Sequence, residues 1–536
     1  MKKQFLSVFI MAALLVGGCS VISHDSSQSN NNTSSSQGGR SSSGSSQGGS
    51  SGGTPVTGTT TIDIFSSNDV HGQIYQQGER AGILKFMSFF KEMGEKPNTL
   101  LLDQGDTWQG SIYSNSTRGA LYTDLYNYVK FDARSVGNHD FDWGADYIAQ
   151  NSLRTYNGYS TPTLAGNVYN YDFENKIVGT EQQSQIGRKS VIYTLENGVK
   201  VGILGGIGQD QITSICTNNV QDVVFTDHIQ FIKDEATHLR NDEHCDIVIC
   251  SIHTGQESVM GNNLGDYVDL VLCGHTHREE TAAEGSLRYV QSLGYTGSFG
   301  YTTLTYDYAT KKVTKTKVNF LSAYDIVSYV DTIDAGVQQI FNSYKNSIDA
   351  STNPSQVLAN NVVGYFYSSE QAANLMCKAI YDTATSAGYN VCLSYVNYAR
   401  QSLPYGSSWT YEDIYTSFPF DNIIYIADIK GSELLYEVRG YNYIYRNPSF
   451  TSNVIDPNGT YKIAVIDYLY THANSERYYD YFSVTGGTST TTLPNNYREI
   501  LRSWLISEGY NSGKELNSSD YSSSLWQHDR TVFTTV

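Results

Sequence analysis

The chain has 536 residues, which is too many for one hydrophobic core and predicts two domains with additional segments. Its formal net charge of −18 argues against nucleic acid as a partner, although bound cations would still allow an acidic protein to take an anionic substrate. The seven cysteines include no C-x-x-C pair, so a thiolate zinc site is not expected, and the sequence leaves open whether any of them form disulfides.

Residues 1–19 have the pattern of a bacterial export signal. Lys2 and Lys3 precede an apolar run, residues 5–16, that is too short to span a membrane permanently. Gly17-Gly18-Cys19 follows and resembles a lipobox, so we predict that Cys19 is lipidated and becomes the mature N-terminus. The alternative is an ordinary cleaved signal with an incidental cysteine.

Residues 20–58 are dominated by Ser, Gly, Asn and Gln and cannot bury a core, so we expect a disordered tether. Random-coil scaling gives a tether of this length a typical end-to-end distance of about 35 Å. No later stretch has the length and apolar character of a transmembrane helix. We therefore expect a protein that is lipid-anchored at the extracellular face of the bacterial cell membrane.

After the tether, strand-like patterns alternate with helical ones, which indicates an α/β fold. We predict a first domain over residues 59–321. Apolar residues at helical spacing predict a helical linker or hinge over 322–355. A second domain is predicted over 356–536, with strands over 422–428 and 461–466.

Five polar clusters in the first domain each follow an apolar run of strand length. The runs are residues 62–65, 99–102, 131–136, 247–252 and 270–273. The clusters are Asn68-Asp69-Val70-His71, Gly105-Asp106, Gly137-Asn138-His139-Asp140-Phe141-Asp142, His253 and Gly274-His275-Thr276-His277. Because open α/β sheets collect ligands at the carboxyl ends of their strands, we expect the clusters to converge on one crevice.

The side chains in these clusters suit zinc, manganese or iron(II). Two cations about 3.5–4 Å apart, bridged by an aspartate, would clamp the oxygens of a phosphoryl transfer and lower the pKa of a bound water to about 7. Each cluster alone has an alternative as a turn, a helix cap or a solvent-exposed histidine. His275 and His277 are expected to share one face of an extended backbone. The clusters contain five of the 11 histidines, and their order favours a metal-assisted hydrolase.

The five clusters, in this order, resemble the calcineurin-like metallophosphoesterase superfamily, and with the second domain they resemble the bacterial secreted 5′-nucleotidase and 2′,3′-cyclic-nucleotide phosphodiesterase family. The resemblance implies an α/β chain in which a four-layer α/β/β/α catalytic domain is joined by the helical linker to a C-terminal α/β substrate-binding domain. It also implies two divalent metal ions, zinc, manganese or iron. Their ligands would be Asp69, His71 and His277 at one ion, Asn138, His253 and His275 at the other, and Asp106 as the bridge.

Catalytic residues also follow from the resemblance. His139, oriented by Asp142, would stabilise charge on the transferring phosphoryl group or protonate the leaving oxygen. The family often has glutamate where Asp140 stands and, in some members, glutamine where His277 stands, and both changes keep plausible chemistry.

The second domain resembles the family less completely. Phe420 and Tyr468 would stack on the nucleobase, worth about 1–3 kcal/mol per stacked base. Asn422 would contact the sugar or base, and Arg400 would also bind substrate. The two glycines that the family usually has before Arg400 are missing, and His472-Ala473-Asn474 stands where some members have Gly-Gly-Asp, so the nucleoside pocket is expected to be remodelled.

We therefore predict a surface-anchored two-metal phosphohydrolase that removes phosphate from extracellular nucleotides by attack of a metal-bound hydroxide. It is expected to be a monomer that binds no nucleic acid. The altered pocket leaves open a cyclic-nucleotide or other phosphodiesterase, or a hydrolase of non-nucleoside phosphate esters. A surface adhesin or binding protein with a vestigial catalytic domain is an alternative of another class, which the complete set of predicted ligands argues against.

Overall fold

The computed structural model describes residues 57–172, 177–178, 186–283, 285, 287–406, 408–432, 434, 443–446, 454–473, 488–522 and 534–535. The predicted signal, Cys19 and the tether up to residue 56 lie outside the described residues. In the described segments, no helix combines the length and the apolar character needed to cross a membrane.

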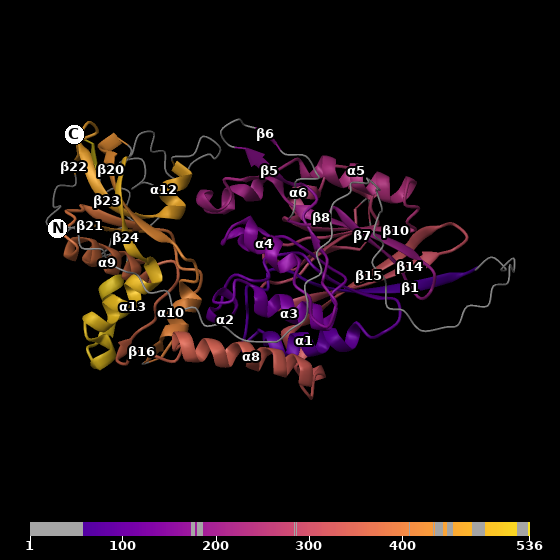
Figure 1. Cartoon of the computed structure of the whole chain (residues 1–536), viewed down its shortest axis with the longest axis horizontal. Coiled ribbons are helices and arrows are strands. Elements are labelled where there is room, and N and C mark those ends of the chain that lie inside the picture. The colour runs from indigo at the N-terminus through magenta and orange to yellow at the C-terminus, as the bar shows by residue number, and fades with distance from the viewer. Residues whose placement is uncertain are drawn as a thin grey trace, which may run out of the picture. The chain divides into compact units, whose positions relative to one another are not determined.

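Two six-stranded sheets form the centre of the first domain in the described part of the chain (Figure 1). The first sheet has the order β15 (Lys312–Ser322), β14 (Ser298–Asp307), β1 (Thr59–Ser67), β2 (Thr99–Asp103), β3 (Ala133–Ser135) and β4 (Thr163–Leu164). The second has the order β12 (Glu280–Ala282), β13 (Tyr289–Gln291), β11 (Leu270–Leu272), β10 (Ile247–His253), β8 (Lys200–Ile207) and β7 (Ser190–Thr194).

The central strands are parallel, and they are buried on both faces. Every residue of β2 and of β10 is buried, and their near-continuous apolar sequences are typical of such strands. β1 pairs in parallel with β2, and β10 pairs in parallel with β8 and β11. The carboxyl ends of these strands therefore lie at one edge of each sheet. The five apolar runs of the sequence are confirmed as β1, β2, β3, β10 and β11.

Alternating side chains divide the domain into four layers. Ile64 belongs to the core between the two sheets, whereas the next residue, Phe65, packs under helix α1 (Gly82–Met93). On the second sheet Ile203 faces the same inter-sheet core, and Leu204 packs with helix α5 (His228–Asn241). The predicted α/β/β/α order is confirmed.

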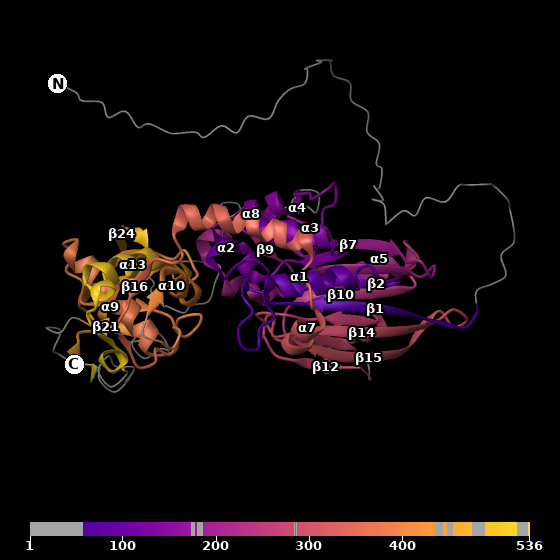
Figure 2. The same ribbon diagram turned by 90° about the horizontal axis from the view of Figure 1, so that it is seen from below.

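Two helices follow β15 in the segment predicted as a linker, α7 (Ala323–Tyr329) and α8 (Ala335–Thr352). Figures 1 and 2 show α8 running beside α3 (Ala120–Val129). Asp334 begins α8 by accepting hydrogen bonds from the backbone of Gly336 and Val337, and it also accepts one from the Tyr128 hydroxyl of α3.

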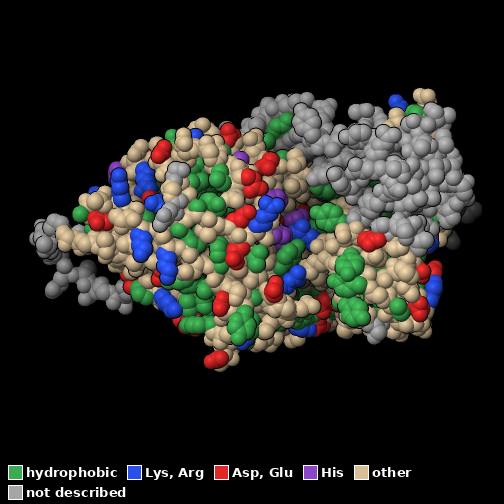
Figure 3. All heavy atoms as spheres, turned by 180° about the vertical axis from the view of Figure 1, so that it is seen from behind, with side chains coloured by type: hydrophobic (Ala, Val, Ile, Leu, Met, Phe, Trp, Pro, Cys, Tyr) green, Lys and Arg blue, Asp and Glu red, His purple; other side chains and the backbone are tan. Residues whose placement is uncertain are grey.

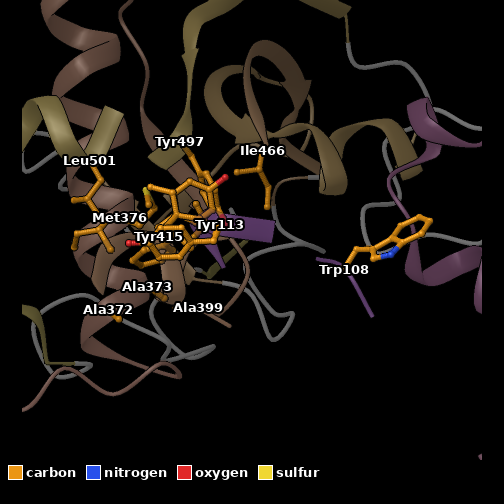
Figure 4. Packing of buried hydrophobic residues seen from close by; sticks show 14 of the residues in the cluster. Trp108, Tyr113, Ala372, Ala373, Met376, Ala399, Tyr415, Ile466, Tyr497 and Leu501 are labelled. Atoms are coloured by element: carbon orange, nitrogen blue, oxygen red, sulfur yellow. The ribbon is translucent and has the colours of Figure 1, made fainter. Parts of the chain in front are cut away.

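The C-terminal part has one five-stranded sheet in its described residues, with the order β21 (Tyr443–Arg446), β18 (Leu393–Val396), β23 (Thr460–Ile466), β20 (Ile423–Lys430) and β24 (Thr488–Asn496). β20 and β23 confirm the two strands predicted there. Helices α9 (Gln371–Ser386) and α13 (Tyr497–Ser507) pack together, and Figure 4 shows Met376 of α9 beside Leu501 of α13.

The remaining elements are short. The helices among them are α2 (Ile112–Asn115), α4 (Ala145–Ser152), α6 (Gln256–Val259), α10 (Tyr411–Ser417) and α12 (Asp467–Ala473). The strands are β5 (Val168–Asp172), β6 (Ile177–Val178), β9 (Val223–Phe225), β16 (Val357–Ala359), β17 (Val362–Val363), β19 (Trp409–Thr410), β22 (Val454–Ile455), β25 (Leu516–Asn517) and β26 (Thr534–Thr535). Among the described residues, the cysteines at positions 216, 245, 250, 273, 377 and 392 form no disulfide with one another.

Candidate functional site

The five clusters meet where the strands of both sheets end. Asp69, Asp106 and Asn138 follow β1, β2 and β3 of the first sheet, whereas His253 ends β10 and His275 follows β11 of the second. Figure 3 shows histidine side chains gathered beside lysine or arginine side chains on one face. The structure thus brings together all seven residues predicted as metal ligands.

The first group of ligand atoms comes from Asp69, His71 and His277. Asp69 Oδ1 lies 3.2 Å from His277 Nε2 and 3.9 Å from His71 Nε2, and the two histidine nitrogens are 3.1 Å apart. Asp69 Oδ2 is already used, because it accepts hydrogen bonds from the Asn68 side chain and the His275 backbone. The other carboxylate oxygen is therefore the one that faces the two imidazoles.

The second group comes from Asp106, His253 and His275, with Asn138 between the histidines. Asn138 Oδ1 lies 3.1 Å from His253 Nε2 and 3.0 Å from His275 Nδ1. Asp106 Oδ2 lies 3.3 Å from His253 Nε2 and 3.7 Å from His71 Nε2 of the first group. One carboxylate oxygen thus faces both groups, as a bridging ligand must.

The donor set fits divalent cations. Asp69 Oδ1 is buried and accepts no hydrogen bond from the described residues, which is unfavourable for a carboxylate unless a cation compensates it. His71 Nδ1 donates to the Gln109 carbonyl and His253 Nδ1 to the Gln104 carbonyl, so Nε2 of each ring points at the site. Within each group, the candidate ligand atoms lie within 4.8 Å of one another.

The charges around the site are strongly coupled. Burial opposes ionisation of Asp106, but His253 and His139 hold the pKa of its carboxyl well below its usual range. Burial would lower the pKa of His253, but Asp106 outweighs this and raises it to about 10. Burial, followed by the charge of His253, lowers the pKa of His275 to about 4. Burial also lowers the pKa of His71, which keeps that imidazole neutral, the form that binds metal.

The backbone is strained at these residues. Five of the seven predicted ligands have left-handed φ angles, Asp69 at 51°, His71 at 50°, Asp106 at 53°, His275 at 76° and His277 at 55°. The expectation that His275 and His277 share one face of an extended backbone is therefore wrong. The left-handed turns send the two side chains to different groups of ligands.

His139 and Asp142 lie beside this centre. The His139 backbone N–H donates to Asp106 Oδ1, and His139 Nδ1 lies 2.9 Å from Asp142 Oδ2. Asp142 therefore fixes the ring and leaves Nε2 for a ligand. Asp140 points elsewhere, into a buried ion pair with Arg134 and a hydrogen bond from the Gly137 backbone.

A cavity of about 510 Å³ opens in front of His139 and His275. The four residues predicted to bind substrate, Arg400, Phe420, Asn422 and Tyr468, all line it. The Phe420 ring stacks on the His139 ring with centroids 5.4 Å apart and an interplanar angle of 28°. The cavity thus joins the candidate metal centre to aromatic side chains of the C-terminal part.

Arg400 reaches the first group of ligands directly. Its Nη2 donates to His71 Nε2 at 2.8 Å, and its guanidinium lies 5.7 Å from the ring centroid of Tyr295. Tyr295 in turn packs against His71 and His277. Sequence reasoning missed Tyr295. The available signal was Gly294, a turn residue that directly precedes Tyr295 and comes shortly after strand β13.

The loop that carries Phe420 is held by two arginines through the next residue, Asp421. Asp421 accepts hydrogen bonds from Arg118 of the first domain and from Arg498 of α13, at 2.6 and 2.7 Å. Arg498 also donates to the Phe420 carbonyl. Sequence reasoning noted Asp421 only as part of a stretch that resembles a family motif, and it missed both arginines, whose sequence positions carry no motif.

Residues 64–279 match the family model of the calcineurin-like phosphoesterases. This match covers less than half of the chain, and the layered fold and the converging ligands agree with it over that part.

The relatives of the chain include 5′-nucleotidases. One from Homo sapiens is 26% identical over 238 residues, 42% of this chain and 39% of that protein. The trifunctional nucleotide phosphoesterase protein YfkN of Bacillus subtilis is 22% identical over 469 residues, 78% of this chain and 30% of that protein. The crystal structure of a 5′-nucleotidase precursor from Thermus thermophilus has a TM-score of 0.66 at 17% identity, covering 85% of this chain and 97% of that one, and shares the two-part fold.

The chain spans less than half the length of the curated relatives that it matches, between 30% and 39% for the two above. Their activities are therefore properties of larger proteins.

Because Asp106 Oδ2 faces both groups of ligands, we expect the number of bound metal ions to depend on Asp106. After loading with manganese or zinc and gel filtration, the unaltered protein should retain two ions per chain, as counted by mass spectrometry. Asp106→Asn should retain one at most, because the amide cannot bridge two cations. The exposed carboxylate variant Asp234→Asn is the control and should retain both. Two tightly held ions in Asp106→Asn would refute the bridge.

Proposed function

We propose that this protein is a two-metal phosphohydrolase of nucleotides, of the 5′-nucleotidase type. The observation that carries the proposal is the single oxygen, Asp106 Oδ2, that faces both groups of ligands beside a cavity lined by Phe420 and Tyr468. Divalent ions held by Asp69, His71, Asp106, Asn138, His253, His275 and His277 would polarise the phosphate and activate water.

Arg400 contributes a positive charge beside the candidate metal centre, at His71. His71 Nε2 has one lone pair, which accepts the hydrogen bond of Arg400 in this structure. The lone pair cannot serve a cation and Arg400 together, so a cation held by His71 would leave the guanidinium free to bind another group. A guanidinium released beside the centre is well suited to bind phosphate oxygens by paired hydrogen bonds.

His139 is suited to act on the leaving group. Asp142 accepts the hydrogen bond of Nδ1 and so orients Nε2 toward a ligand in the cavity. In that position His139 stabilises negative charge on the phosphoryl group or donates a proton to the departing oxygen. Phe420 stacks on a face of the His139 ring and also helps to hold the ring in place.

The base-binding part of the proposal rests on Phe420 and Tyr468, which line the cavity together with Asn422. Aromatic faces accept any flat base, which suits a pocket that lacks the family's two glycines. The phosphodiesterase and the non-nucleoside phosphoesterase remain the alternatives, and the missing glycines are the observation that favours them.

We also propose that the protein acts at the extracellular face of the cell membrane, anchored through a lipidated Cys19. The support is the lipobox-like Gly17-Gly18-Cys19 and the Ser- and Gly-rich residues 20–58 after it. Detergent phase partition of the protein from whole cells tests this. The unaltered protein should enter the detergent phase and Cys19→Ser the aqueous phase, and identical partition of the two would contradict the anchor.

Leaving-group chemistry tests His139. His139→Ala should lower kcat on AMP by about 10²–10⁴. The loss on para-nitrophenyl phosphate should be much smaller, because nitrophenolate departs without protonation. Asp142→Asn should lower kcat on AMP less than His139→Ala does. Equal losses on both substrates would contradict proton donation and leave His139 with charge stabilisation alone.

A substrate panel tests the nucleotide assignment. Phosphate release from AMP, 2′,3′-cyclic AMP and para-nitrophenyl phosphate should show the highest kcat/KM for AMP. Phe420→Ala should reduce kcat/KM for AMP at least tenfold more than for the aryl phosphate, because the ring stacks on a base. Leu293→Ala, an exposed apolar residue away from this cavity, is the matched control. Preference for the cyclic or the aryl substrate would instead support one of the alternatives.

A further inference from the structure

The base end of the cavity contains a buried carboxylate that the chemistry above does not use. Asp467 begins helix α12, is 9% exposed and lines the cavity next to Tyr468. Asn422 directly precedes β20, and the antiparallel register that pairs Ile424 with Ile466 brings it beside Asp467. Asn422 directly precedes β20 and Asp467 directly follows β23, so the pairing of these two strands sets the separation of the two residues.

The pair has a defined hydrogen-bond direction. Asn422 Nδ2 donates to Asp467 Oδ1 at 2.6 Å, and the same oxygen accepts from the Tyr468 backbone at 2.8 Å. An ionised carboxylate accepts hydrogen bonds and donates none, so the amide of Asn422 must face it with nitrogen. The Asn422 backbone is also held, since its carbonyl accepts from the Tyr497 N–H.

The carbonyl end of Asn422 is then left for a ligand. In the described residues no donor bonds Asn422 Oδ1, and the side chain lines the cavity. Phe420 lies two positions before Asn422, and Tyr468 directly follows Asp467. All four residues line the cavity, so each residue of the pair is close in sequence to one of the two aromatic residues. A flat base between the rings would present its edge to this oxygen.

We propose that Asp467 is a positioning residue that sets the base preference of the pocket, because it holds Asn422 with a hydrogen-bond acceptor toward the base edge. The inference rests on the proposed nucleotide phosphohydrolase. Bases with an exocyclic amino group, adenine and cytosine, donate to this oxygen. Their keto counterparts, hypoxanthine and uracil, present a carbonyl at the same position, and two facing acceptors repel.

The preference depends on the charge of Asp467. Burial raises the pKa of Asp467 to about 6, although the hydrogen bond from Asn422 opposes the shift. Above this pH the carboxylate holds Asn422 as described. Below it, the protonated carboxyl can donate to Asn422 Oδ1, which allows the amide to turn and removes the preference. The titratable groups facing Asp467 are the Cys216 thiol and the Tyr497 hydroxyl, and burial raises the pKa of both, Cys216 to about 12, so both stay neutral.

The test is the ratio of kcat/KM for AMP over IMP, and for CMP over UMP, measured between pH 5 and 8. The chemical step is common to each pair, so the pH dependence of the catalytic centre cancels in the ratio. At pH 7.5 both ratios should be about ten, the factor that corresponds to one hydrogen bond. They should fall toward one at pH 5.

Asp467→Asn should bring both ratios close to one at every pH, because a neutral amide can pair with Asn422 in either direction. Asp428→Asn is the matched control, since Asp428 is a carboxylate on strand β20, which follows Asn422, and it pairs with Lys462 and does not line the cavity. Its ratios should equal those of the unaltered protein. Should Asp467→Asn fail to fold, Asn422→Ala removes the acceptor itself and should also give ratios near one.

The outcomes separate the inference from the function on which it rests. If AMP and IMP are both far better substrates than para-nitrophenyl phosphate but the ratios are one, or if Asp467→Asn keeps the ratios and lowers both rates equally, Asp467 has only a structural role and the inference is overturned. If no nucleotide exceeds para-nitrophenyl phosphate, the proposed function fails, and the inference fails with it.

Discussion

Burial of negative charge at the ends of the central strands is the constraint on which the rest of this structure depends. Asp69 and Asp106 are 0% and 1% exposed, where an uncompensated carboxylate costs several kcal/mol. Four histidines and an asparagine from both sheets converge on these carboxylates, and Asp106 Oδ2 faces both groups. Divalent cations would compensate these carboxylates and use the histidine nitrogens as ligands.

The two-sheet architecture serves this requirement. Parallel strands end at a common edge, so residues distant in sequence, such as Asp69 and His275, come within hydrogen-bonding distance. Left-handed backbone at five of the ligands gives each side chain its direction, and burial of β2 and β10 in the inter-sheet core holds that strained backbone in place. The C-terminal part then supplies what the strand ends lack, a guanidinium from Arg400 and an aromatic face from Phe420.

Most of the strands and of the converging residues could be predicted from the sequence, because the end of a buried strand has a recognisable local pattern. An apolar run followed by Asp, Asn or His predicted the strands and the residues that meet, from Asp69 to His277. It did not predict the backbone conformation of Gly274-His275-Thr276-His277, since a left-handed histidine has no sequence signal. The roles of Gln104 and Gln109 could not be predicted either, because these residues orient His253 and His71 through their backbone carbonyls and not through their side chains. Asp421 lies in a stretch that resembles a family motif, but its partners Arg118 and Arg498 come from remote parts of the chain that only the tertiary fold brings together.

The most direct measurement is a crystal structure of the manganese-loaded protein with AMP, with data collected at the manganese absorption edge. We expect two anomalous peaks about 3.5–4 Å apart, with Asp106 between them, the phosphate on the side of His139 and the adenine between Phe420 and Tyr468. A single peak, or two peaks that Asp106 does not join, would contradict the two-metal centre. A base bound away from Phe420 and Tyr468 would contradict the nucleotide pocket.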